Sequence, residues 1–155
     1  MNATPAIVSA SITQGSIMAS TEPDKPQNVS TAIDVIEATY ELTLAYAAQG
    51  REPEENDPLG IRQALHRADI ALDILAAAAP ADFGSPGGGV AQATADMLAV
   101  LRQDIAHARA AIRFVLAQRQ IGSQIIDNLN ASIHVRSLLT DIFLLDEAFE
   151  RQPGF

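Results

Sequence analysis

The sequence contains no cysteine and no tryptophan, and its ten basic residues include a single lysine. The lack of cysteine excludes disulfide bonds, thiolate zinc sites and thiol nucleophiles from these 155 residues. Basic residues are also outnumbered, because 19 Asp and Glu residues give the chain a formal net charge of −9. A general nucleic-acid binder needs surplus Lys and Arg to contact phosphates, so nucleic acid is not an expected partner.

Long uninterrupted apolar runs are absent as well. A helix that crosses a membrane needs about 18 or more consecutive apolar residues. The strongly apolar stretch 138–149 is shorter and is interrupted by Asp141, Asp146 and Glu147. The first twenty residues lack the cationic start of a secretory signal peptide. We therefore expect no membrane span and a cytoplasmic location.

What the sequence does have is apolar content in a helical pattern. Apolar residues make up 48% of the chain, and no stretch alternates with the period of two that a half-buried strand requires. Apolar positions instead recur in steps of three and four residues, which predicts an all-α fold. We expect an antiparallel four-helix bundle with helices near 31–48, 59–79, 90–120 and 123–150. The bundle domain covers 30–155, and residues 1–29 form a loose tail.

Residues that begin and end helices support these boundaries. Ser30 is a favourable N-cap for the first helix, and Asp57 followed by proline suits the start of the second. Gly50 and Pro80 end these two helices. Gly122 separates the third helix from the fourth. An isolated glycine costs only about 1 kcal/mol inside a helix, so one continuous, kinked helix is the alternative there.

Two of the predicted helices carry more apolar surface than one core stripe requires. The first helix has a second apolar stripe, and the apolar face of the last helix changes side midway. Another part of the chain, a second copy or a partner must cover this surface. If a partner covers the last helix, Ile142, Phe143 and Leu145 stay partly exposed in a single chain. The residues expected at the interface are Val35, Leu42, Tyr46, Leu138, Ile142, Phe143, Leu145 and Phe149.

Two of the three histidines stand three residues from an aspartate. The pairs His66 with Asp69 and Asp104 with His107 each share one helical face, and metal sites in helical bundles use facing pairs of this kind. These four residues are the candidate metal ligands. Both histidines lie on polar faces of their helices, away from the leucines, so we expect no metal and no cofactor.

Arg102 and His107 give a second hypothesis for chemistry. Their spacing, with four residues between them, resembles that of an arginine and a histidine in helical-bundle ribonucleases of the HEPN kind, and the resemblance covers six residues. It implies that Arg102 binds phosphate and that His107 is a general base. On an ideal helix, however, the two side chains point about 140° apart.

We interpret the chain as a non-enzymatic helical interaction protein. An adaptor, chaperone-like protein or assembly factor would bind itself or a protein partner through its apolar helix faces. Abundant alanine and the excess of Arg over Lys are consistent with a bacterium that has a GC-rich genome. The alternative is a helical-bundle hydrolase, nuclease or metal-dependent enzyme that uses His107 with Arg102 or Asp104.

Overall fold

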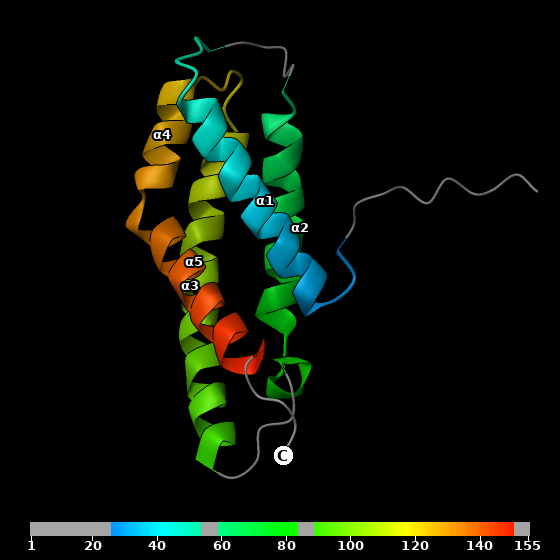
Figure 1. The fold of residues 1–155 in the computed structure, drawn as a ribbon. Helices are drawn as coiled ribbons and strands as arrows, with labels where there is room; N and C mark the ends of the chain where they lie inside the picture. Colours follow the sequence, from blue (N-terminus) through cyan, green and yellow to red (C-terminus); the bar gives the residue numbers. More distant parts are fainter. Residues whose placement is uncertain (1–25, 54–58, 84–88, 151–155) are drawn as a thin grey trace, which may run out of the picture.

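The computed structural model describes residues 26–53, 59–83 and 89–150. These residues form five α-helices and one short 3-10 helix, η1 (Figure 1). The elements are α1 (Val29–Ala47), α2 (Ile61–Ala77), η1 (Pro80–Phe83), α3 (Gly89–Leu116), α4 (Ser123–Ala131) and α5 (Ile133–Glu150). No strand occurs in the described ranges, so the predicted all-α class is confirmed for them. Residues 1–25 of the predicted tail lie outside these ranges.

The first helix begins slightly earlier than the sequence predicted. Its N-cap is Asn28 rather than Ser30. The Thr31 backbone N–H donates to Oδ1 of Asn28 at 2.9 Å, and the Asn28 backbone N–H donates to the Thr31 hydroxyl at 3.1 Å. This reciprocal pair satisfies two of the N–H groups that the start of a helix leaves without partners.

The segment 123–150, predicted as one helix, forms two. The backbone of Ser132 is extended, with a ψ of 127°, which ends α4 before α5 begins. Figure 1 shows the change of direction at this point. The break explains why the apolar face changes side along the sequence. Ile126 of α4 and Leu138 and Ile142 of α5 all reach one core, because the second helix is reoriented relative to the first.

Helices α2 and α3 end in contacts with each other. Arg62 of α2 donates to the carbonyl of Leu116 at 2.6 Å, at the point where α3 ends. In return, Arg102 of α3 donates to the carbonyls of Ala76 at 3.0 Å and Ala78 at 2.6 Å, at the C-terminal end of α2. Each guanidinium therefore satisfies carbonyl groups that have no partner within their own helix.

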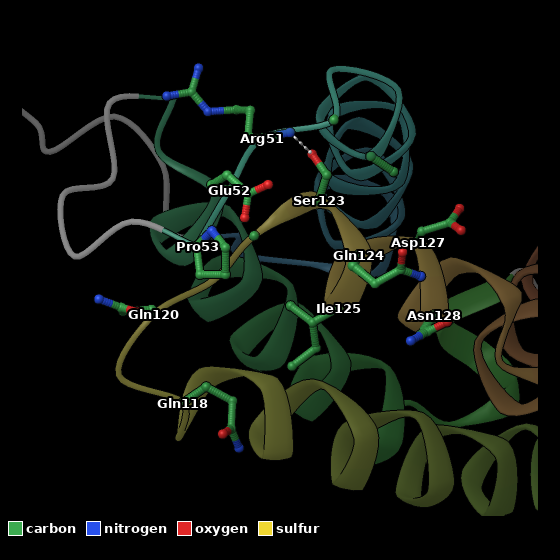
Figure 2. A pocket seen from close by; sticks show the side chains of 13 residues that line it. Arg51, Glu52, Pro53, Gln118, Gln120, Ser123, Gln124, Ile125, Asp127 and Asn128 are labelled. Atoms are coloured by element: carbon green, nitrogen blue, oxygen red, sulfur yellow. Dashed lines mark hydrogen bonds between the residues drawn. The ribbon is translucent and has the colours of Figure 1, made fainter.

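The loop after α1 is joined tightly to the connection between α3 and α4. Backbone N–H of Arg51 donates to the Ser123 hydroxyl at 2.8 Å, and backbone N–H of Ser123 donates to the carbonyl of Arg51 at 2.9 Å (Figure 2). A Cβ atom at Gly122 would lie 2.8 Å from the backbone nitrogen of Pro53, so only glycine fits this close approach. Gly122 thus separates two helices, as the sequence predicted.

The core lies between these helices. Helix α1 packs against α2 and α4, while α3 packs against α2 on one flank and against α5 on the other. None of the described helices combines the length and hydropathy needed to cross a membrane. The largest fully buried side chains are Ile61, Leu65, Leu72, Leu75, Leu98, Leu101, Ile105, Ile126 and Ile142.

Candidate interaction surface on helices α3 and α5

Two side-chain contacts fix how α3 and α5 lie against each other. The ring centroids of His107 and His134 are 4.9 Å apart, and the carboxyl groups of Asp104 and Asp141 are neighbours. Residue numbers fall along α3 from the first contact to the second, while they rise along α5. The two helices are therefore antiparallel here, and the four side chains form a row along the seam, which we call the acid–histidine row.

The acid end of this row brings two like charges together. Burial raises the pKa of Asp141, and the neighbouring carboxyl of Asp104 raises it further. The Oδ2 atom of Asp141 is buried, and no hydrogen-bond donor among the described residues reaches it. Two carboxyl groups can hydrogen-bond only when one of them holds a proton. The pair is therefore relieved either by a shared proton or by a cationic group.

The histidine end of the row is more accessible. Nδ1 of His107 lies 3.9 Å from Oδ1 of Asp104, beyond direct hydrogen-bond distance, and the His107 side chain is exposed. Asp104 thus stands between an imidazole on its own helix and a carboxyl group on α5. Within the described ranges, no group of three or more His, Asp or Glu side chains is arranged to hold a metal ion.

A shallow hollow of about 470 Å³ lies beside the row. It contains the two acids, one arginine and two hydroxyl side chains. Its lining residues are Asp104, Ala131, Ile133, Arg136, Ser137, Thr140 and Asp141.

Large apolar side chains on α3 and α5 remain exposed, and one of them, Ile133, lines this hollow. Ile133 is 71% exposed, Leu144 58% and Val100 48%. Val100 precedes Asp104 by one turn of α3, and Leu144 follows Asp141 by about one turn of α5, so the antiparallel seam places them on the same side of the acids. We call this surface, together with the acid–histidine row, the α3–α5 face. Exposed apolar residues next to a polar hollow are typical of interaction sites.

The residues predicted for chemistry do not all meet. Arg102 points to the end of α2, where it binds backbone carbonyls, and not toward His107. Asp69 accepts hydrogen bonds from Arg109 at 2.8 Å and Arg113 at 3.0 Å. His66 is exposed on α2. Of the four candidate metal ligands, the pairs on α2 and α3 do not meet: the neighbours of Asp104 and His107 come from α5 rather than α2.

Most of the predicted partner-binding residues are covered by this chain itself. Tyr46 is buried, and its hydroxyl donates to the carbonyl of Ile121 at 2.7 Å. Leu138, Ile142 and Leu145 belong to the core, so the expectation that Ile142 and Leu145 stay exposed is wrong. The reason is the break at Ser132, which turns this side of α5 inward.

The remaining predicted interface residues have three different outcomes. Val35 and Leu42 are partly buried and pack against the core, so the chain covers much of the second stripe of α1 itself. Phe143 is 46% exposed on the outer side of α5, next to Leu144. The side chain of Phe149 lies outside the described part of the chain.

Sequence reasoning missed His134 and Asp141 as neighbours of the candidate ligands. A signal for their pairing was present, since residues seven apart share a face of a helix. The sequence did not show which helix this face contacts, because its orientation toward α3 depends on the break before α5.

A second hollow, of about 510 Å³, lies at the opposite end of α4 (Figure 2). Its lining is rich in carboxamides, among them Gln118, Gln120, Gln124 and Asn128. Figure 2 shows these side chains around the junction of Arg51 with Ser123. No large exposed apolar residue lines this hollow, which distinguishes it from the α3–α5 face.

The chain matches no protein-family model, and no curated protein or solved structure matches it either.

Proposed function

We propose that this chain is a non-enzymatic helical interaction protein that binds a protein partner through the α3–α5 face. One observation carries the proposal: Ile133 is exposed at a hollow that also contains Asp104 and Asp141, and further exposed apolar residues, Leu144 and Val100, lie on the two helices that carry these acids. Burial of such side chains contributes roughly 1.5–3 kcal/mol each, which makes them effective anchors. In this proposal α4 and α5 together occupy the fourth position of an antiparallel bundle.

The chemistry of the face indicates the chemistry of the partner. A lysine or arginine side chain placed between Asp104 and Asp141 would offset the repulsion between the two carboxyl groups and supply a donor for the buried oxygen. Apolar side chains on either side of that base would cover Leu144 and Ile133. A basic, amphipathic helix has both features.

The same reasoning favours a different protein over a second copy of this chain. Each copy carries a formal net charge of −9, so self-association would bring like charges together. An adaptor or assembly factor in the bacterial cytoplasm, as the sequence predicts, is the form of this function that we propose.

The test uses a designed basic amphipathic helix as the probe, with an acidic version of the same apolar sequence for comparison. We expect the full chain to bind the basic peptide at least tenfold more tightly, and Leu144→Ser with Ile133→Ser to remove this binding. The matched control is Ile70→Ser, because Ile70 is an exposed apolar residue on α2. Equal binding of both peptides, or equal loss in the control, would contradict the proposal. Light scattering that shows a dimer lost with Leu144→Ser would indicate self-association instead.

A second candidate function rests on the histidine end of the row. His107 lies next to His134 and 3.9 Å from Asp104, a separation that would have to shorten for the acid to orient a general base. Hydrolysis of RNA or of bis(4-nitrophenyl) phosphate that is lost in His107→Gln and kept in His66→Gln would support it. Arg102 is not part of this candidate site, since its guanidinium caps α2.

A further inference from the structure

A narrow pocket runs into the core between α1 and the α4–α5 pair. It encloses about 40 Å³, and α2 and α3 contribute side chains to its wall. None of its lining residues carries a charge. These residues are Ile36, Thr39, Tyr40, Thr43, Leu65, Ala68, Leu72, Ile112, Leu129, Asn130, Val135, Leu138 and Leu139.

One polar side chain in this wall lacks the hydrogen bond that its burial requires. Asn130, in the last turn of α4, is only 8% exposed, and its Nδ2 has no acceptor among the described residues. The threonine hydroxyls of the wall are already used by their own helix. Thr39 donates to a carbonyl one turn earlier at 2.7 Å, and Thr43 does the same at 2.7 Å. Asn130 is therefore a buried side chain in this wall with an unused donor.

A buried N–H group without an acceptor destabilises the folded chain, because it lost its hydrogen bonds to water on folding and gained no other. A ligand oxygen in the pocket would restore that bond. The ligand would also be uncharged, since no charged side chain lines the wall to compensate an ion. The small volume leaves room for little more than the oxygen-bearing end of the molecule.

The wall beyond Asn130 suits an aliphatic chain. Val135 and Leu139 of α5 line the pocket, and Phe143 follows Leu139 by one turn on the same helix. Phe143 is half-exposed, so apolar side chains follow this side of α5 from the pocket to an exposed residue.

We infer that this pocket binds a slender, uncharged and mainly aliphatic molecule with a single oxygen acceptor, such as an alcohol, a ketone or an ester. The oxygen accepts a hydrogen bond from Nδ2 of Asn130, and the carbon chain extends along Val135 and Leu139. This site is separate from the α3–α5 face and does not depend on the function proposed for that face.

The test compares two probes of nearly equal shape, 2-hexanone and n-hexane, by ¹H–¹⁵N NMR titration of the full chain. We expect the ketone to bind about tenfold more tightly, since one hydrogen bond to a buried donor separates the two probes. The side-chain amide signals of Asn130 should shift with the ketone. Asn130→Leu should remove the preference, while Asn128→Leu, at an exposed position of the same helix, should keep it.

Folding and binding are kept apart by two further measurements. Asn130→Leu should melt at the same temperature as the unmodified chain or higher, because it removes an unsatisfied polar group. Leu139→Trp, which fills the pocket, should weaken the binding of both probes. Equal affinity for ketone and alkane, or Asn130 signals that do not move, would show that the pocket holds water only and would overturn the inference. The basic-peptide experiment with Leu144→Ser is unaffected by either result.

Discussion

The two flanks of α3 meet their neighbours in opposite ways. On the flank toward α2, Arg109 and Arg113 share the carboxylate of Asp69, and Arg109 also reaches Asp73. On the flank toward α5, two carboxyl groups face each other and a buried oxygen lacks a donor. One helix thus carries a seam of opposite charges and a seam of like charges.

The difference indicates where the molecule gains stability and where it keeps surface for another task. In the α2–α3 seam, the contact between Arg109 and Asp69 pairs two groups that folding largely removes from water. In the α3–α5 seam, the acid pair opposes folding unless a proton or a cation intervenes. The exposed apolar residues Ile133 and Leu144 lie beside the second seam. Residues that oppose folding but suit a ligand are a recurrent feature of functional sites.

The largest effect is expected from breaking the seam of opposite charges. Arg109→Ala should lower the free energy of unfolding by about 2 kcal/mol, because it leaves Asp69 partly buried with only one remaining arginine. Chemical denaturation at neutral pH measures this. Arg113→Ala is the control, since its side chain is more exposed and its removal should cost less than about 1 kcal/mol. Equal losses in both variants would show that the seam is not organised around Arg109.

Removing the repulsion in the seam of like charges should raise the free energy of unfolding, and by a smaller amount. Asp141→Asn should raise the free energy of unfolding at neutral pH by about 1 kcal/mol, because the amide donates a hydrogen bond to Asp104 without a shared proton. Asp146→Asn, on the same helix, serves as the control. A loss of stability in Asp141→Asn would mean that the two carboxyl groups do not oppose each other in the folded chain.

The two seams should also respond oppositely to pH. Burial alone would raise the pKa of Asp69, but hydrogen bonds and charge from Arg109 and Arg113 outweigh it and hold that pKa below its ordinary value. Its contribution to stability is present above the ordinary pKa of about 3.9 and is lost as the pH falls through the folded pKa. The raised pKa of Asp141 works in reverse, since stability falls as the pH rises from about 3.9 through that folded pKa.

Denaturation of two variants between pH 2 and pH 7 tests these signs. Relative to the unmodified chain, Asp69→Asn should be less stable at pH 7 and Asp141→Asn more stable. Both differences should shrink toward zero in acid, where the aspartates are protonated. Differences that stay constant with pH would exclude a charge effect in either seam.

The smallest effect on stability is expected at the exposed apolar residues. Leu144→Ser should change the free energy of unfolding by no more than about 0.5 kcal/mol, because the side chain is largely in solvent already. Leu138→Ser, at a core position of the same helix, should lower the free energy of unfolding several times more than Leu144→Ser does. If Leu144→Ser destabilised the chain as strongly, the residue would belong to the core and not to a surface for partners.

Much of the fold could be predicted from the sequence, because helix boundaries depend on local chemistry. Gly50 and Gly122 mark places where helices end or begin, and helical periodicity placed α1, α2 and α3 within a few residues. The end of α3 was predicted too late because it depends on Arg62, a distant residue that binds its final carbonyls. The candidate site was harder to predict from the sequence, since Asp104 and His107 were identified but Asp141 and His134 were not.

The break between α4 and α5 separates what the sequence determined from what the tertiary structure decided. The sequence alone determined the helical class and the residues with apolar side chains, because both follow from the period of the α-helix. It also contained the change of apolar face in the last segment, which we interpreted as a surface for a partner. Only packing decided that Ser132, neither a glycine nor a proline, would interrupt the helix. The physical reason is that two opposite apolar faces cannot reach one core on a straight helix, and burying both outweighs the hydrogen bonds lost at the break.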